Sequence, residues 1–115
     1  MKFVSFLIKG QPKFGVSDGK NITDLTGKIK GAQTLKELII NESINEAKEF
    51  SKKNPGKINV DEIDYLPVIP NPGKIVCVGL NYSEHVKETG RTVEQNPVIF
   101  LRVPESQTAH KQPIQ

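Results

Sequence analysis

The chain has 115 residues and a formal net charge of +3, from 16 Lys and Arg against 13 Asp and Glu. This length suits one domain or a part of one. The basic residues are scattered and Trp is absent, so the clustered basic and aromatic pattern of a nucleic-acid-binding protein is missing. No apolar run is long enough for a membrane span or a convincing signal peptide, and the single cysteine, Cys77, excludes an internal disulfide. We therefore expect a cytoplasmic protein with no nucleic-acid and no membrane partner.

Three strand signals lie in the first 25 residues. Their expected bounds are 2–8, 14–17 and 21–25. Gln11 and Pro12 predict the first turn, and Asp18 followed by Gly19 predicts a hairpin between the second and third strands. These signals indicate a small sheet at the start of the chain.

Two helices are expected next, the first capped by Thr34 and the second running from about residue 43 to 52. Apolar residues at helical spacing define one side of each: Leu35, Leu38 and Ile39 in the first, and Ile44, Ala47 and Phe50 in the second. Asn54, Pro55 and Gly56 end the second helix. Together with the sheet, these helices predict an α+β fold for residues 1–56.

Residues 57–73 are expected to form a connector, because three prolines within it favour extended backbone over helix. The acidic residues Asp61, Glu62 and Asp64 lie in this segment. A metal site is one interpretation of this group, but a solvated linker is expected because charge runs usually face water.

The stretch from Pro72 to Gly90 carries the strongest functional signal. Residues 74–80 form a short apolar run typical of a strand buried on both faces, with Cys77 as a small buried hydrophobe rather than a nucleophile. Asn81 can cap a following short helix, with Glu84 at capping-box spacing and Gly90 placed to end it.

On that helix His85 and Glu88 are three residues apart and so share one face. A carboxylate beside an imidazole fixes its tautomer and raises its basicity, which suits a general base; the alternative is a surface ion pair. Downstream, residues 98–101 predict a further strand that Arg102 ends. His110, in a tail rich in Gln and Pro, is expected to be a loop histidine.

These residues resemble the signature of the fumarylacetoacetate hydrolase family. The string KIVCVGLNY at 74–82, followed by His85 and Glu88, is similar to the family motif. The proline-rich segment 66–72 resembles the family's approach to that motif, and residues 97–102 resemble its second strand. The likeness is specific over 66–102 and weak over the first 60 residues.

The resemblance implies a metal-dependent enzyme that acts on a keto acid or β-diketone, by C–C hydrolysis, decarboxylation or keto–enol isomerisation, in breakdown of aromatic compounds or sugar acids. His85 and Glu88 would form the catalytic dyad, and Asn81, Tyr82 and Arg102 would contact the substrate, although packing is an alternative for Tyr82. The family cofactor is Mg²⁺, or in some members Ca²⁺ or Mn²⁺. We also expect a homo-oligomer, such as a dimer.

Two departures from the family pattern affect these expectations. The family usually has Lys followed directly by Pro where this chain has Arg102, Val103 and Pro104, so Arg102 is either a carboxylate ligand or a surface cation. The E-x-E pair that supplies family metal ligands occurs nowhere in the sequence, so no metal ligand is assigned to this chain.

We therefore expect a small N-terminal α+β domain at 1–56, the connector at 57–73, and at 74–115 the first strands of a mainly β catalytic domain that is truncated. Because the E-x-E pair is missing, the chain alone is predicted to show no metal-dependent turnover. It is also predicted to self-associate, because two central strands would lack their neighbours. The alternative function is a non-catalytic remnant or interaction module.

Overall fold

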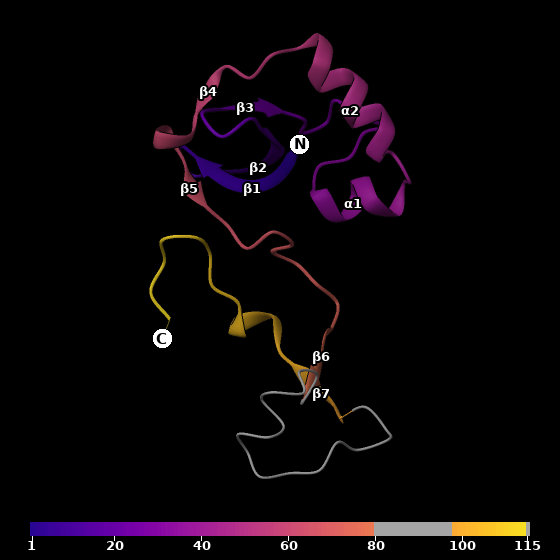
Figure 1. Ribbon diagram of the computed structural model, residues 1–115, viewed down its shortest axis with the longest axis vertical. Coiled ribbons are helices and arrows are strands. Elements are labelled where there is room, and N and C mark those ends of the chain that lie inside the picture. The colour runs from indigo at the N-terminus through magenta and orange to yellow at the C-terminus, as the bar shows by residue number, and fades with distance from the viewer. Residues whose placement is uncertain (80–97, 115) are drawn as a thin grey trace. The chain divides into compact units, whose positions relative to one another are not determined.

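The computed structural model describes residues 1–79 and 98–114, which fall into two compact units (Figure 1). The first unit contains Met1–Asn71 together with the segment that begins at Gln107, and the second is Pro72–Ser106. The first unit combines a sheet with two helices, so the α+β class is confirmed for it. None of the helices formed by the described residues has the length and apolar character that a membrane span requires.

The first unit is built on a curled antiparallel sheet of strand order β4-β3-β2-β1-β5 (Figure 1). The strands are β1 (Lys2–Ile8), β2 (Gln11–Ser17), β3 (Asn21–Asp24), β4 (Ile58–Asn59) and β5 (Asp64–Tyr65). The first three follow one another as hairpins in the order that the sequence predicts. The two short outer strands pair with β3 and β1, so both edges of this sheet come from the segment expected to be a connector.

The first turn lies at Lys9 and Gly10, so the prediction of a turn at Gln11 and Pro12 is wrong. Both turn residues have positive φ, 51° and 74°, which a two-residue hairpin with the right-handed strand twist requires. Pro12 instead pairs with Leu7 inside the ladder. Because hydrogen-bonded and non-hydrogen-bonded pairs alternate from the turn, Pro12 falls at a non-hydrogen-bonded pair and its missing N–H costs β1 no bond.

The second hairpin confirms the signal at Asp18 and Gly19. Asp18 Oδ1 accepts hydrogen bonds from the backbone N–H groups of Lys20 (2.8 Å) and Asn21 (2.7 Å). Gly19 has a φ of +106°, which side-chain-bearing residues rarely adopt. The aspartate thus supplies the local hydrogen bonds and the glycine supplies the backbone freedom that the reversal needs.

The helices are α1 (Leu35–Ile40) and α2 (Ile44–Lys53), close to the predicted bounds. Thr34 caps α1 as expected: its side chain accepts from Glu37 N–H at 3.2 Å, and the Glu37 carboxylate accepts from Thr34 N–H in return. This reciprocal pair satisfies two N–H groups that a helix start leaves without intrahelical partners.

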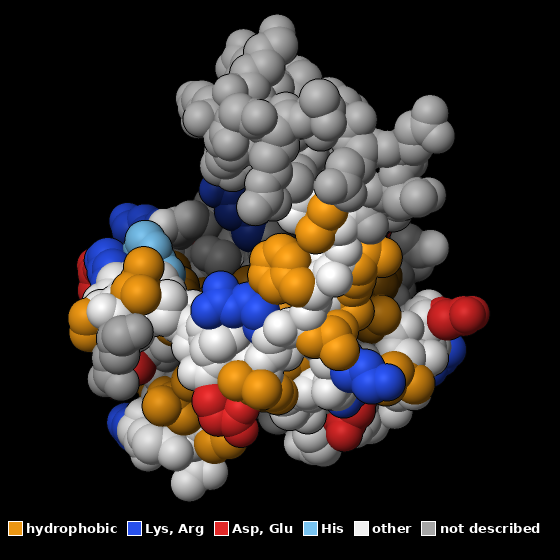
Figure 2. All heavy atoms as spheres, turned by 90° about the horizontal axis from the view of Figure 1, so that it is seen from below, with side chains coloured by type: hydrophobic (Ala, Val, Ile, Leu, Met, Phe, Trp, Pro, Cys, Tyr) orange, Lys and Arg blue, Asp and Glu red, His pale blue; other side chains and the backbone are white. Residues whose placement is uncertain are grey.

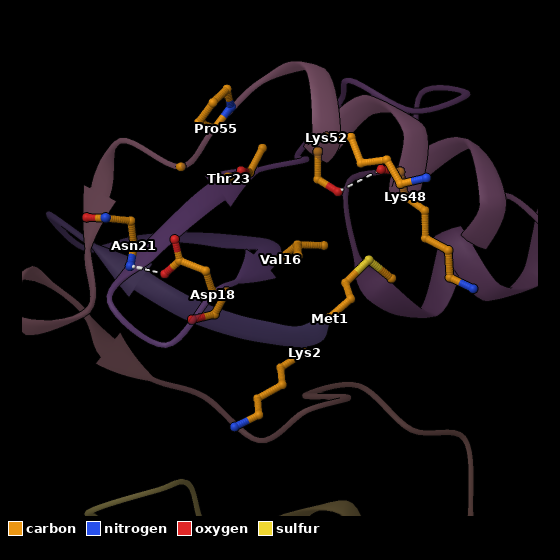
Figure 3. A pocket seen from close by; sticks show the side chains of 12 residues that line it. Met1, Lys2, Val16, Asp18, Asn21, Thr23, Lys48, Lys52 and Pro55 are labelled. Atoms are coloured by element: carbon orange, nitrogen blue, oxygen red, sulfur yellow. Dashed lines mark hydrogen bonds between the residues drawn. The ribbon is translucent and has the colours of Figure 1, made fainter.

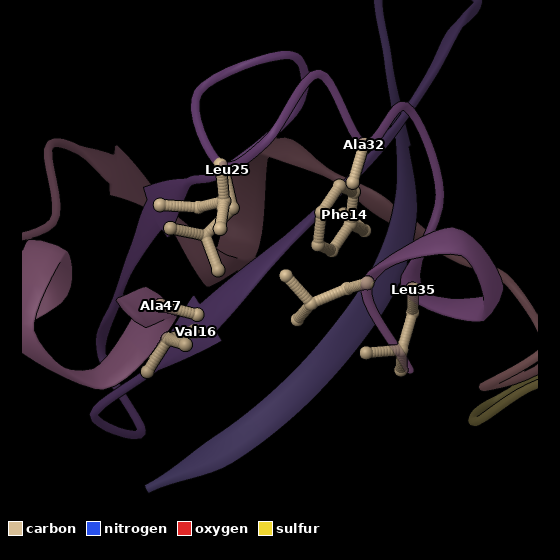
Figure 4. Packing of buried hydrophobic residues seen from close by; sticks show 8 residues of the cluster. Phe14, Val16, Leu25, Ala32, Leu35 and Ala47 are labelled. Atoms are coloured by element: carbon tan, nitrogen blue, oxygen red, sulfur yellow. The ribbon is translucent and has the colours of Figure 1, made fainter. Parts of the chain in front are cut away.

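The hydrophobic core lies between β2, the segment after β3 and the two helices (Figure 4). Its buried members are Phe14, Val16, Leu25, Ile29, Ala32, Leu35, Leu38 and Ala47. Burial of each large apolar side chain stabilises the fold by about 1.5–3 kcal/mol. Ile39, predicted to face the same side as Leu38, is instead exposed, because one short helix buries a narrower row than the sequence pattern suggested.

The segment expected as a connector carries β4, a 3₁₀ turn at Val60–Glu62 and β5, all packed within the first unit. Asp61, Glu62 and Asp64 are exposed, in keeping with the solvated interpretation of these acids. The division into domains at 1–56, 57–73 and 74–115 stays a prediction.

The second unit contains the antiparallel pair β6 (Ile75–Gly79) and β7 (Val98–Arg102), followed by a 3₁₀ turn at Pro104–Ser106. Both strands were expected at these positions. That these are the first strands of a fumarylacetoacetate-hydrolase-type catalytic domain stays a prediction from the sequence.

Candidate functional site

The β6–β7 hairpin flanks the stretch of sequence that carries the predicted catalytic residues. Its register pairs Ile75 with Arg102 at one end and Gly79 with Val98 at the other. Residues 80–97 connect the latter pair, so the candidate stretch leaves one strand and returns to its direct partner. The two apolar runs that the sequence predicts to be strands therefore pair with each other, one before and one after this stretch.

Four of the five predicted site residues lie outside the described residues. They are the expected dyad His85 and Glu88 and the expected substrate contacts Asn81 and Tyr82. The helix predicted from Asn81 to Gly90 falls in the same stretch, outside the described residues. Their roles and their mutual geometry stay predictions.

Arg102 is the predicted site residue that the structure describes. It is the last residue of β7 and is exposed, and its Nη2 donates to the backbone carbonyl of Ser106 at 3.5 Å. The turn after it is closed by Ser106, whose N–H and Oγ both donate to the carbonyl of Val103, at 3.0 and 2.7 Å. This long single contact leaves most of the guanidinium fork accessible for a carboxylate.

The two faces of the hairpin differ in character. Residues that are direct partners point to the same side, so Arg102 shares a face with Ile75, Cys77 and Phe100. The opposite face contains only apolar side chains, namely Val76 (59% exposed), Val78 (52%), Ile99 (60%) and Leu101 (67%). Exposed hydrophobic side chains are visible in the space-filling view of Figure 2.

The prediction that residues 74–80 form a strand buried on both faces is therefore wrong for β6. Val76 and Val78 point to solvent, and Cys77 is half-buried. The physical reason is the size of the sheet: among the described residues β6 has β7 as its sole strand neighbour, and two strands alone cannot enclose a core. The apolar run indicates which side chains favour burial, but it does not indicate whether other described residues cover them.

The described residues do not fit a metal site. No group of three or more His, Cys, Asp or Glu side chains within 1–79 and 98–114 is arranged to hold an ion. Asp61, Glu62 and Asp64, for which a metal site was one interpretation of the sequence, do not form such a group. No catalytic step can therefore be assigned to a metal held by these residues.

His110 has a contact that the sequence did not predict. Its ring packs edge-on against Tyr65, with centroids 5.1 Å apart and an interplanar angle of 89°. The tail from Gln107 reaches this position beside β5, where Gln107 Nε2 donates to the Ile69 carbonyl at 3.3 Å. An edge-to-face aromatic contact accounts for the position of His110, as expected of a structural loop histidine.

Comparison with known proteins identifies several oxaloacetate tautomerases among the relatives of this chain. A mitochondrial oxaloacetate tautomerase of Xenopus laevis is 32% identical over 108 residues, which covers 90% of this chain and 34% of the relative. A human mitochondrial oxaloacetate tautomerase is 42% identical over 41 residues, covering 36% of this chain and 13% of the relative. The oxaloacetate tautomerase of Escherichia coli K12 is 52% identical over 29 residues, or 25% of this chain and 13% of the relative. No protein-family model matches the chain.

The matches span about a third or less of the length of these curated relatives. The relatives are oxaloacetate tautomerases of the fumarylacetoacetate hydrolase family. The chain is related to that family, and the resemblance inferred from its sequence is confirmed.

Proposed function

We propose that this chain carries part of the active site of a fumarylacetoacetate-hydrolase-family enzyme that acts on a keto acid. Keto–enol isomerisation is the favoured reaction within this proposal, because the named relatives are oxaloacetate tautomerases. C–C hydrolysis and decarboxylation are the other reactions that the resemblance implies. The observation that carries the proposal is this similarity, together with the string KIVCVGLNY followed by His85 and Glu88.

The proposed chemistry is proton transfer at a carbon next to a carbonyl. Glu88 holds one tautomer of His85, and neutral His85 removes the proton from the carbon while the enolate oxygen takes up a proton from water. In the enol-to-keto direction the oxygen loses its proton and the His85 imidazolium returns one to the carbon, a contribution of about 10²–10⁴-fold for a general acid–base group of this type. Arg102 binds a substrate carboxylate through its guanidinium fork, with Asn81 and Tyr82 as further contacts. The accessible guanidinium at the end of β7 supports this role for Arg102.

The proposal includes Mg²⁺, or Ca²⁺ or Mn²⁺, as cofactor, because the resemblance implies one. Such an ion would act as a Lewis acid toward the substrate oxygens when bound. No ligand is assigned to it, since the described residues provide no suitable cluster and the sequence contains no E-x-E pair. The residues of this chain are assigned proton transfer and carboxylate binding only.

The experiment has two stages. We expect the purified 115-residue chain to show no Mg²⁺-dependent enol-to-keto conversion of oxaloacetate, followed by ultraviolet absorbance, because the sequence lacks the E-x-E pair. The coding DNA is then read beyond codon 115, and the product of any open frame containing E-x-E is assayed in the same way. His85→Gln should lower its kcat by about 10²-fold or more, whereas Arg102→Gln should mainly raise KM.

A second candidate function is favoured by the exposed apolar face of the hairpin. In this alternative the chain is a non-catalytic module that self-associates, with Val76, Val78, Ile99 and Leu101 covered by a second copy. A stop codon directly after codon 115, with no E-x-E sequence after it, supports the module over the enzyme. Metal-dependent turnover by the 115-residue chain would contradict it.

A cytoplasmic location is proposed for either function. The support is the single cysteine, which suits a reducing compartment. The named animal relatives are mitochondrial, and that location is a property of those proteins.

A further inference from the structure

A hollow of about 570 Å³ opens in the first unit beside the β2–β3 hairpin (Figure 3). Its walls come from the start of β1, the hairpin at Ser17–Asn21, one side of α2 and the segment Pro55–Gly56. This volume lies within the range of about 300–1,000 Å³ typical of small-molecule sites. Neither the family resemblance nor the proposed reaction assigns a role to it.

The position of Gly56 shapes one wall of the hollow. A Cβ at Gly56 would lie 2.7 Å from the Ile22 carbonyl carbon and 2.9 Å from the Ile22 nitrogen and oxygen, so the chain passes directly against β3. Just before it, Thr23 Oγ1 donates to the Asn54 carbonyl at 2.9 Å and ties the end of α2 to the same strand. The wall is therefore held by the sheet rather than by a free loop.

The floor of the hollow is apolar and its two sides carry opposite charge. Val16, which is buried, lies centrally, while Asp18 and Asn21 lie on one side and Lys48 and Lys52 on the other (Figure 3). Asp18 Oδ1 is occupied by two backbone N–H groups, which hold the pKa of that carboxyl below its ordinary value. The carboxylate side thus repels an anion, and the lysine side attracts one.

The lysines are not equally available. Lys52 Nζ pairs with Glu49 at 2.7 Å. Lys48, one turn earlier on the same side of α2, and Lys2, at the start of β1, make no ion pair among the described residues. Their exposed ammonium groups are therefore able to pair with a ligand at little cost in broken contacts.

We propose that this hollow is a binding site for a small organic monoanion, with the apolar body of the ligand over Val16 and its anionic group directed to Lys48 on the α2 side (Figure 3). A carboxylate with a phenyl or short alkyl body has this chemistry. Ser51, half-buried on the inner side of α2, borders the space that the apolar body occupies.

The test uses the full 115-residue chain, with 4-phenylbutyrate as the probe and 4-phenylbutan-1-ol as its neutral counterpart. Backbone amide NMR shifts are followed at low salt. We expect saturable shifts at 16–23 and 48–56, with a dissociation constant of about 1 mM, as suits a ligand of this size in an open hollow. The alcohol should bind about five- to tenfold more weakly, the effect of one partly exposed charge pair.

Three variants separate the contributions. Lys48→Gln should weaken phenylbutyrate binding about fivefold and leave the alcohol unaffected. Lys53→Gln removes a lysine of the same helix that does not line the hollow, so it should change neither. Ser51→Phe places a ring where the apolar body would lie and should abolish binding of both probes while the NMR spectrum remains that of a folded chain.

The absence of saturable shifts, equal affinity for acid and alcohol, or shifts confined to β6 and β7 would overturn the proposal. These outcomes do not depend on turnover of a keto acid. Failure of the proposed enzyme function and failure of this site are therefore distinguishable.

Discussion

Replacing Val78 and Ile99 by Thr should weaken self-association of the chain. The two residues are direct partners on the apolar face of the hairpin, and Thr keeps the branched shape that suits a strand. The side chains on this face are 52–67% exposed, so covering each one contributes about 1 kcal/mol, roughly half the value for complete burial.

In a two-fold symmetric dimer each side chain counts twice, which gives roughly 8 kcal/mol for four side chains. Association costs about 4–15 kcal/mol in lost freedom, so at most about 4 kcal/mol remains and the wild-type dissociation constant should be about 1 mM or weaker. The double substitution removes part of two contributions in each copy, roughly 3 kcal/mol per dimer, or about 100-fold in the dissociation constant.

Sedimentation velocity over a range of concentrations measures this shift. Val68→Thr is the matched control, because Val68 is 60% exposed but belongs to the first unit. It should leave the dissociation constant unchanged. A monodisperse wild-type monomer at high concentration, or equal effects of the control and the double variant, would refute the reasoning.

Other substitutions test the first unit by chemical denaturation. Thr34→Ala should lower the free energy of unfolding by about 1 kcal/mol through loss of the α1 cap, and an unchanged midpoint would show that the capping box contributes nothing. Gly56→Ala should lower it by about 1–3 kcal/mol, since the added Cβ meets the backbone of Ile22; an equal or higher stability would contradict that contact. For Asp24, burial raises the carboxyl pKa, but the Lys13 ammonium at 2.6 Å and the Thr26 N–H outweigh it and hold the pKa below 3.8. The stability from this pair is therefore present above about pH 4 and is lost as pH falls through the lowered pKa. Asp24→Asn should lower the free energy of unfolding by about 1 kcal/mol at pH 7 and reduce the loss of stability on acidification. Parallel profiles of stability against pH for variant and wild type would exclude this linkage.

The local elements of this protein follow from short stretches of sequence. Asp18 and Gly19 contain the hydrogen-bond acceptor and the backbone freedom of their hairpin, and Thr34 with Glu37 contains a complete helix start. The exception is the first turn, where Pro12 is of a residue type typical of turns but lies inside β2 without removing a hydrogen bond to β1. The turn forms instead at Lys9 and Gly10, and the positive φ of Lys9 is not predicted by its residue type.

For the candidate site, the sequence supplied the string at 74–82 and with it the family, which similarity to known proteins confirms. The proposed pairing of His85 with Glu88 rests on sequence spacing alone. The spacing of Lys48 and Lys52 also predicts a shared helix face, but it contains no sign that a hollow lies beside that face.

Sequence by itself determined the class of the fold, its caps and turns and the family relationship, because these depend on neighbouring residues and on a contiguous motif. Tertiary structure decided that residues 58–59 and 64–65 close the two edges of the sheet, that the tail returns to Tyr65, and that Val16 and Lys48 border one hollow. It also decided that one face of β6 is open to solvent. Each of these outcomes depends on contacts between residues far apart in the chain, and hydrophobic pattern specifies that a side chain should be covered without specifying what covers it.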